Sequence, residues 1–492
     1  MFVDREEELG YLENAYKSKK AEFFIIFGRR RIGKTSLIKY FSRNKKHFYF
    51  LAKKQKLSLE IERLTERIAE ELKIYIKDRR SMESVFRELV EKLDKKQKTV
   101  IVIDEFTYWV EQDKGVLSEF QVIWDEILHK ENIFLILSGS AMSVMESDVM
   151  GTKSPIYGRR TGQILLHQLP LYALKAFLPS YSFLDIINVY GVTGGVPYYI
   201  QEFSDKLKFK RNLLQTVFNK SNILSMEAEI LLREELREIH IYFAILRTIL
   251  EGATKTSEIA SKSQVDMTNI NKYLRVLMQL KLIEKEFPVT GPAKSKNFLY
   301  YIKDNYMRFW LKYYYYNEGA IEENAEYVVD SVINDYDNYI GRYVFEEVCK
   351  TAFSKLTGFR YSKIGRWWIQ ENEIDIVAVN ESKNEIFFAE CKWKRKKIPT
   401  SDLQELIETA QRVKWRNKNR KEHFAFFSRA GFDKEAENFA SKNNIMLFDL
   451  KDIESKFMKA RLKALTSRSK ATYKDVEELS KKINKAVAER YK

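Results

Sequence analysis

The sequence predicts an α/β protein in which a parallel sheet covered by helices precedes a helical region and a second α/β region. Segments 23–27, 98–106 and 132–141 are rich in apolar and β-branched residues, as buried parallel strands are, and an amphipathic run follows the first. At 492 residues the chain exceeds one hydrophobic core, so we expect roughly two to four domains.

A glycine-rich loop follows the first predicted strand. Gly28 and Gly33 enclose four residues and Lys34-Thr35 come next, which is the G-x-x-x-x-G-K-[ST] pattern between a strand and a helix. Backbone N–H groups in such a loop, and the positive end of the helix, face an anion. The pattern predicts that Lys34 binds the β- and γ-phosphates of ATP and that Thr35 binds Mg²⁺; an ordinary glycine turn is the alternative. The residues expected to bind the cofactor here are Gly28, Arg29, Arg30, Arg31, Ile32, Gly33, Lys34, Thr35 and Ser36.

Acidic and hydroxyl side chains end the next two predicted strands. Asp104 and Glu105 end the second strand. We expect Asp104 to hold Mg²⁺ through water and Glu105 to polarise the attacking water, unless the strand merely ends in two acids. Ser138 and Ser140 end the third strand. A polar group there either senses the γ-phosphate or caps the next helix.

Arg159 and Arg160 precede a further strand-like run. A guanidinium beside the γ-phosphate would stabilise transition-state charge, either within one chain or from a neighbouring subunit. With Glu105 and Lys34, these arginines are the candidate catalytic residues. Surface arginines without that role are the alternative. The three arginines between the loop glycines are not needed by the motif, and we expect them to face solvent or a partner.

The order of these motifs resembles the archaeal-type AAA+ ATPases, relatives of the signal-transduction NTPases, over about residues 1–235. Gly194-Gly195 ending one helix and Pro197 beginning the next also fit a hinged helical lid. The resemblance implies ATP hydrolysis by a P-loop AAA+ sheet with such a lid. The segments that carry it are FVDREEEL, GRRRIGKTS, VIVIDEF, LILSGSAMSVM, PIYGRRTGQI and YGVTGGVPYYI.

Residues 236–301 are predicted to form three short helices and a β-hairpin, an order that resembles a winged helix. The third helix of that fold lies in the major groove of DNA. Its candidate contacts are Asn269, Asn271, Lys272 and Arg275. A winged helix used only for packing is the alternative. The aromatic residues of 306–319 are expected to lie in a core or a domain interface.

Three acids and a lysine form a second candidate site. Glu346 lies on a predicted helix, Asp375 on a strand, and Glu390 and Lys392 on the strand after a turn. Alternate strand residues share a face, so Glu390 and Lys392 point the same way, and antiparallel pairing brings Asp375 near Glu390. Such carboxylates suit a second Mg²⁺ or Mn²⁺, and Lys392 suits a scissile phosphate.

The pattern resembles the restriction-endonuclease-like PD-(D/E)xK fold, although Ile374 stands where that motif has proline. It also resembles a C-terminal domain of unassigned function often fused to this ATPase type. A hairpin stitched by Glu/Asp–Lys pairs, or a nuclease fold without activity, is the alternative.

Charge and composition limit the partners. Residues 392–421 and 456–492 each carry a net charge of +8, which together equals the +16 of the whole chain. This charge favours DNA as a partner, with a solvated helix face as the alternative for the tail. Two cysteines exclude a disulfide framework, five histidines without Cys/His pairing argue against structural zinc, and no apolar run approaches a membrane span. We therefore expect a cytoplasmic protein without a signal peptide.

The sequence thus predicts an Mg²⁺-dependent ATPase that couples its nucleotide state to DNA binding and to metal-dependent DNA cleavage. A homo-oligomer is a candidate assembly. A nucleotide-switched DNA-binding regulator or a scaffold, neither with nuclease activity, is the alternative. The predicted parts are an ATPase core (1–175), a helical lid (176–235), a winged helix (236–305), an aromatic helical connector (306–335), an α/β restriction-endonuclease-like domain (336–455) and a basic tail (456–492).

Overall fold

The computed structural model describes residues 2–292, 297–417 and 419–466, the last seven of these by their backbone alone. The chain folds into two compact units. The first holds the chain up to Leu169 together with Val196–Tyr199 and Leu231–Arg237. The second holds Pro170–Gly195, Ile200–Ile230 and the chain from Glu238 onward. The segment predicted as a lid is therefore divided between the two units.

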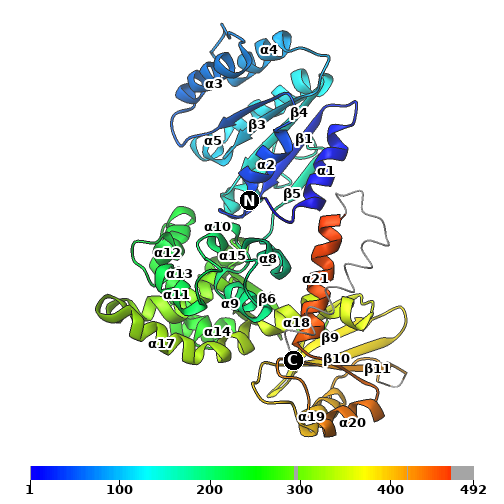
Figure 1. The fold of residues 1–492 in the computed structure, drawn as a ribbon. Helices are drawn as coiled ribbons and strands as arrows, with labels where there is room; N and C mark the ends of the chain where they lie inside the picture. Colours follow the sequence, from blue (N-terminus) through cyan, green and yellow to red (C-terminus); the bar gives the residue numbers. More distant parts are fainter. Residues whose placement is uncertain (1, 293–296, 418, 467–492) are drawn as a thin grey trace. The chain divides into compact units, whose positions relative to one another are not determined.

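The first unit contains a parallel sheet of five strands in the order β2-β3-β4-β1-β5 (Figure 1). The three segments that the sequence predicts as strands are β1, β3 and β4, so this prediction is confirmed. Because the strands are parallel, the loop at Gly28 and the acids at Asp104 and Glu105 lie at the same edge of the sheet. The strands are β1 (Glu22–Phe27), β2 (His47–Leu51), β3 (Thr99–Asp104), β4 (Ile133–Gly139) and β5 (Gly162–Leu165).

Helices cover both faces of this sheet. On one face, Leu37 and Phe41 of α2 join α1 in a buried cluster with Phe24 and Phe134 of the strands. On the other face, Trp109 of α5 contacts Phe50 of β2. The helices of this unit are α1 (Glu6–Tyr16), α2 (Lys34–Ser42), α3 (Leu57–Leu72), α4 (Met82–Lys92), α5 (Thr107–Gln112), α6 (Gly115–Val122) and α7 (Met142–Val144).

The second unit begins with helices. The aromatic residues of the connector lie mainly in its core, as predicted: Tyr306, Phe309 and Trp310 are buried, and Tyr339 of α17 packs against Phe309. The helices are α8 (Leu174–Phe177), α9 (Phe183–Thr193), α11 (Phe209–Gln215), α16 (Asn305–Phe309), α17 (Glu318–Tyr343) and α18 (Phe345–Thr357), while α10 (Pro197–Gln201) and α12 (Ile223–Glu235) contribute residues to both units.

Three helices and an antiparallel strand pair occupy residues 239–302, in the order that the sequence predicts. Ile270, Leu274 and Leu277 of the third helix are buried, which confirms the apolar spacing. The elements are α13 (Ile239–Leu250), α14 (Thr256–Ser263), α15 (Ile270–Gln279), β6 (Ile283–Glu286) and β7 (Leu299–Ile302).

The chain continues into a second five-stranded sheet, of order β12-β11-β10-β9-β8, in which β8, β9 and β10 are antiparallel and β10, β11 and β12 are parallel. Figure 1 shows helices on both sides of it. Its elements are β8 (Lys363–Ile369), β9 (Asn372–Asn380), β10 (Glu385–Lys392), α19 (Thr400–Ala410), β11 (Lys421–Ser428), α20 (Lys434–Lys442), β12 (Ile445–Phe448) and α21 (Leu450–Thr466).

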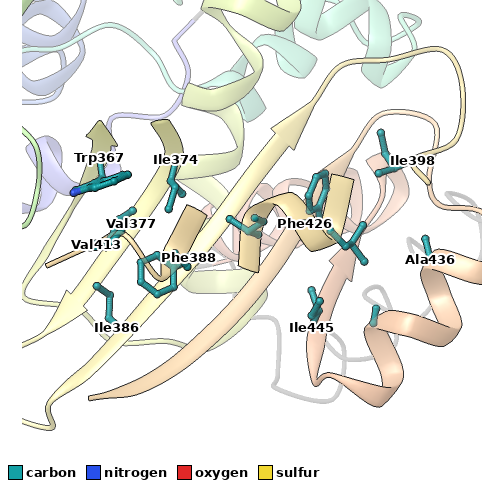
Figure 2. Close-up of a cluster of buried hydrophobic side chains, with 14 of the residues drawn as sticks. Trp367, Ile374, Val377, Ile386, Phe388, Ile398, Val413, Phe426, Ala436 and Ile445 are labelled. Carbon is teal, nitrogen blue, oxygen red and sulfur yellow. The ribbon is translucent and has the colours of Figure 1, made fainter. Parts of the chain in front are cut away.

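An apolar core lies between this sheet and the helices α19 and α20. Figure 2 shows Phe388 of β10 and Phe426 of β11 in this cluster, with Ala436 contributed by α20. The next residue along β10, Phe387, contacts Phe353 of α18 instead. Side chains of β10 therefore alternate between two helix layers, so the register of this strand decides which face each polar residue reaches.

We predict that Phe388→Ala lowers the free energy of unfolding of this region by about 3–5 kcal/mol, because Phe388 is fully buried and its removal leaves a cavity. Urea unfolding followed by hydrogen exchange in β10 measures this change. The control is Ile369→Ala, at a side chain 45% exposed, where the change should stay within about 0.5 kcal/mol. Equal effects of the two substitutions would contradict the placement of this core.

Candidate functional site

The loop between β1 and α2 has the geometry of a phosphate loop. Gly28 and Gly33 have φ of +149° and +94°, values that favour glycine. A Cβ at Gly28 would approach both the Ile32 side chain and the Leu166 carbonyl to 2.5 Å. Lys34 Nζ donates to the carbonyl oxygens of Gly28 at 2.9 Å and Arg29 at 3.2 Å. The lysine is thus held inside the loop, and burial lowers its pKa.

The carboxylate of Asp104 lies directly below this loop. Thr35 Oγ1 donates to Asp104 Oδ2 at 2.7 Å, and the Ser138 hydroxyl donates to Oδ1. A hydroxyl and a carboxylate are hard oxygen ligands, so this pair fits Mg²⁺. The sequence predicts all three residues. It misses Tyr49, whose hydroxyl also donates to Oδ2, at 2.6 Å, because no local spacing links β2 to Asp104.

Glu105 follows in the left-handed region, with φ of +57°. Its Oε2 accepts hydrogen bonds from the hydroxyl of Ser140 at 2.7 Å and from the Ser140 backbone N–H at 3.1 Å. Ser140, predicted to sense phosphate or to cap a helix, thus holds the acid that follows Asp104. This uncommon backbone conformation separates the two acids: Asp104 is buried in the strand end while Glu105 reaches open space.

A cavity of about 580 Å³ opens beside Glu105. Arg30 of the loop crosses its wall, where it pairs with Glu234 at 2.6 Å and donates to the Tyr108 hydroxyl at 2.7 Å. Burial raises the pKa of the neighbouring Glu235 to about 7. The lining residues are Arg30, Leu51, Ala52, Lys53, Lys54, Glu105, Tyr108, Glu111, Ala141, Arg233, Glu234 and Glu235.

The expectation that all three loop arginines face solvent or a partner is wrong for Arg29. This side chain is only 7% exposed, and its guanidinium donates to the Tyr199 hydroxyl at 3.2 Å. The Arg31 guanidinium lies over the Tyr198 ring, 4.4 Å from its centre. Both tyrosines belong to α10, after the predicted hinge. The sequence shows Pro197 as a helix start but gives no sign that the following tyrosines reach the loop.

Arg159 and Arg160 do not approach the loop of their own chain. The register Phe24↔Gly162 puts them beside the amino end of β1, whereas the loop follows its carboxyl end, roughly 15 Å along the strand. Arg159 pairs with Asp125 at 2.9 Å, and Arg160 bonds to Met150. The predicted action within one chain is therefore wrong because of the parallel register. Action on a neighbouring subunit stays a prediction.

Two acids of the second candidate site, Asp375 and Glu390, face each other as the strand alternation predicts. Continuing the register Ala389↔Ile376 by one residue sets Glu390 opposite Asp375, and their carboxyl groups share a hydrogen bond. Lys392 Nζ pairs with Glu390 at 2.8 Å. Cys391 points to the other face, as expected, where its side chain contacts Cys349 of α18. We call Glu346, Asp375, Glu390 and Lys392 the carboxylate cluster.

Burial and mutual repulsion change the titration of this cluster. Burial, with the nearby Asp375 carboxylate, raises the pKa values of Glu346 and Glu390 to about 8. Burial alone would lower the pKa of Lys392, but Glu390 raises it above its usual range. Across the described ranges, no three or more His, Cys, Asp or Glu side chains are arranged to hold a metal ion. Lys392 pairs with Glu390, and Arg366, which the sequence analysis missed, lies 3.6 Å from Glu346.

Comparison with known proteins assigns the family. A family described as an ATPase domain predominantly from Archaea matches residues 2–203, and a family of archaeal and bacterial proteins of unknown function matches residues 310–406. An uncharacterized protein of Methanocaldococcus jannaschii is 35% identical over 399 residues, which are 80% of this chain and 88% of that protein. The chain belongs to this archaeal ATPase family.

Two further matches concern parts of the archaeal ATPase. An uncharacterized ATP-binding protein of Methanocaldococcus jannaschii is 56% identical over 46 residues, 9% of this chain and 78% of that protein. The Walker-type ATPase structure from Pyrococcus abyssi is 21% identical, with a TM-score of 0.48, and covers 63% of this chain and 96% of its own. In the part of the archaeal ATPase that the structure describes, no helix is long and apolar enough to cross a bilayer.

The residues in and beside the phosphate loop of the archaeal ATPase suit ATP hydrolysis. Lys34, already inside the loop, would exchange its backbone carbonyl acceptors for phosphate oxygens. Glu105 is the carboxylate that can take a proton from water once it leaves Ser140. Thr35 and Asp104 would hold Mg²⁺, which would neutralise charge on the phosphates.

We predict that Glu105→Gln lowers the rate of ATP hydrolysis about 10²- to 10⁴-fold, because it removes the base that polarises water. ATP affinity should be retained, since Lys34 and the loop are untouched. Lys34→Ala should instead abolish ATP binding, because it removes a phosphate contact. Single-turnover hydrolysis and equilibrium binding of a fluorescent ATP analogue measure the two effects.

Glu126→Gln is the matched control, at an exposed acid outside the cavity lining. It should hydrolyse ATP at the wild-type rate. Wild-type turnover by Glu105→Gln would show that another group polarises the water.

Proposed function

We propose that this ATPase couples its nucleotide state to DNA binding by the second unit, and that the carboxylate cluster cleaves the bound DNA with a divalent cation. One observation carries the proposal. Asp375 and Glu390 face each other across β9 and β10, with Lys392 on the same face, two residues along. Two carboxylates and an ammonium at the end of a strand pair are the groups that metal-assisted hydrolysis of a phosphodiester needs.

Basic residues next to the cluster support a polyanion as its substrate. Residues 394–397 begin two positions after Lys392, and all four side chains are exposed. Lys394 pairs with Asp402 and Arg395 with Asp337, which orders the start of the segment. Lys396 and Lys397 extend the positive charge beyond these pairs. A phosphate backbone that bound here would lie a few residues from Glu390.

Helix α15 offers a second DNA contact. Asn269, Asn271, Lys272 and Arg275 are all exposed, while the apolar residues between them are buried. The three helices and the strand pair follow the winged-helix order, in which this helix enters the major groove. Polar and basic side chains on one exposed helix face suit base edges and phosphates.

The chemistry proposed for the cluster is hydrolysis of the phosphodiester. Asp375 and Glu390 would hold Mg²⁺ or Mn²⁺, which supplies Lewis-acid activation of water when bound. A water oxygen forms a new bond to phosphorus and loses a proton to solvent, while the bond to the leaving deoxyribose oxygen breaks and that oxygen gains a proton from solvent. Lys392 would break its ion pair with Glu390 and neutralise the scissile phosphate instead. Glu346, on the amino-terminal turn of α18, interacts electrostatically with Asp375 but is not arranged with the other two acids as a three-acid metal site in the described residues.

The ion pairs of the cluster favour a second candidate function. Lys392 pairs with Glu390, and Arg366 contacts both Glu346 and Glu373. A cluster neutralised in this way can stabilise the sheet without catalysis. The second candidate is therefore an ATP-switched DNA-binding protein that lacks nuclease activity.

The chain path suggests how nucleotide state reaches the second unit. Arg29 and Arg31 of the phosphate loop hold Tyr199 and Tyr198, so the loop and residues 196–199 should move together. These residues connect to α9 through Gly194-Gly195, which both have positive φ. We therefore expect a rearrangement of the loop around phosphate to shift the carboxyl-terminal end of α9.

Helix α9 is in turn fixed to the helices that precede the carboxylate cluster. The Tyr336 hydroxyl of α17 donates to the Asn188 carbonyl at 2.6 Å, and that of Tyr339 donates to the Gly191 carbonyl at 3.0 Å. The Tyr190 hydroxyl donates to Glu347 of α18 at 3.0 Å. Because Glu347 is next to Glu346, a shift of α9 is transmitted to the cluster.

We predict that the wild-type protein cleaves DNA with Mg²⁺ or Mn²⁺ and that Glu390→Ala abolishes cleavage without loss of ATP hydrolysis. Glu405→Gln is the matched control, at an exposed acid of α19 in the same domain, and it should cleave as the wild type does. Incubation of purified variants with plasmid and linear DNA measures this. Absence of cleavage by the wild type, with DNA binding retained, would favour the switch without nuclease activity.

We predict that metal binding to the cluster strengthens as pH rises from 6 to 9. The pKa values of Glu346 and Glu390 are raised to about 8, so both carboxyls hold protons at pH 6 that a cation must displace. Mn²⁺ titration at several pH values, with the nucleotide site removed by Lys34→Ala, measures this dependence. An affinity independent of pH would show that these carboxyls are not the ligands.

We predict that DNA affinity falls steeply with salt and that replacing Lys396 and Lys397 by alanine flattens the slope of log K against log salt by roughly one unit for each lysine. Deletion of 456–492 tests the tail, of which residues 467–492 lie outside the described chain. Binding measured across a range of salt concentrations separates the two segments. An unchanged slope in both variants would direct attention to α15.

A further inference from the structure

The Asp104 carboxylate has no acceptor position to spare. Oδ2 accepts the hydroxyl protons of Thr35 at 2.7 Å and Tyr49 at 2.6 Å. Oδ1 accepts the Ser138 hydroxyl and the Glu105 backbone N–H at 3.1 Å. A carboxylate offers about four lone-pair positions, so these four donors fill it. The group is also 1% exposed, which leaves water no other approach.

An aspartate at this position holds Mg²⁺ through a metal-bound water, and such a water is a hydrogen-bond donor. One of the four protein donors must then give up its place. Thr35 must stay because its hydroxyl oxygen would be the metal ligand. Its hydroxyl can still donate its hydrogen bond to Asp104. Ser138 is buried on the neighbouring strand, and the Glu105 N–H is part of the backbone. Tyr49 is the remaining donor.

Tyr49 is also the donor best able to leave. It lies on β2, the edge strand of the sheet. Its side chain is only partly buried, and the Lys39 ammonium lies 5.3 Å from its ring centre. Tyr49 packs at the margin of the buried cluster that contains Phe24. The fully buried residues of β2 are instead Phe48 and Phe50, so rotation of the Tyr49 side chain would expose its hydroxyl and leave the central core in place.

We propose that Tyr49 is a positioning residue that competes with the hydration shell of Mg²⁺ for Asp104 and thereby sets the Mg²⁺ concentration at which the ATPase binds Mg–ATP. Without the metal, the Tyr49 hydroxyl donates to Asp104 Oδ2 beside the Thr35 hydroxyl. With the metal bound, the Tyr49 hydroxyl would give up this hydrogen bond and leave its acceptor position on Oδ2 to the hydrated Mg²⁺. The tyrosine therefore weakens metal binding, unlike an ordinary supporting residue.

The test is the direction of change in Tyr49→Phe. Binding of a fluorescent ATP analogue is titrated with Mg²⁺ in the Glu105→Gln background, where turnover does not interfere. The half-saturating Mg²⁺ concentration should fall about 2- to 10-fold, the range that corresponds to one net hydrogen bond. Affinity for the analogue without Mg²⁺ should not change, because Tyr49 makes no hydrogen bond to the loop backbone among the described contacts.

Two further variants fix the interpretation. Tyr16→Phe removes a comparable hydroxyl, which donates to the Lys98 carbonyl at 3.0 Å, and should leave the Mg²⁺ dependence unchanged. Thr35→Ala removes a ligand and should raise the Mg²⁺ requirement. The ratio of affinities with and without Mg²⁺ is internal to each variant, so a smaller folded fraction does not alter it. An unchanged or raised Mg²⁺ requirement in Tyr49→Phe would overturn the proposal.

Discussion

The buried carboxylate of Asp104 is the point on which the nucleotide site depends. Donors from three places meet there: Tyr49 from β2, Thr35 from the start of α2, and Ser138 from β4. Thr35 and Ser138 lie at the carboxyl edge of the sheet because its strands are parallel, whereas Tyr49 lies in the middle of β2, opposite Val102, and reaches Asp104 with its long side chain. One buried anion thus ties the phosphate loop to two neighbouring strands. It also leaves Glu105 free of metal binding and available to water.

The second unit also contains buried carboxyl groups, but these are paired with each other. Asp375 and Glu390 are set opposite each other by antiparallel pairing, and burial raises the pKa values of both carboxyls, so that nearby positive charge is needed to favour their ionised forms. Lys392 and Arg366 supply part of it. A bound metal cation, alone or with a phosphodiester, would supply the remaining positive charge. The burial of these carboxyls distinguishes the cluster from an ordinary surface salt bridge, and their pairing with Lys392 and Arg366 is what the two candidate functions interpret differently.

The sequence predicts those features whose geometry follows from local spacing. Lys34 and Asp104 sit in motifs fixed to strand ends, and the pairing of Asp375 with Glu390 follows from alternation across a turn. Contacts made over long sequence separation are not predictable in this way: Tyr199 reaches Arg29 across 170 positions. Arg366 lies where a bulge between Gly365 and Trp367 breaks strand alternation, so its direction could not be inferred.

The central claim is that phosphate bound at the loop changes the second unit through residues 196–199 and α9. Hydrogen exchange of the Glu105→Gln protein, with and without Mg–ATP, tests this directly. The account predicts altered exchange in residues 28–35 and, in the same sample, in residues 183–193 and 345–357. Changes confined to the first unit, with the exchange of α9 and α18 unaffected by ATP, would contradict it.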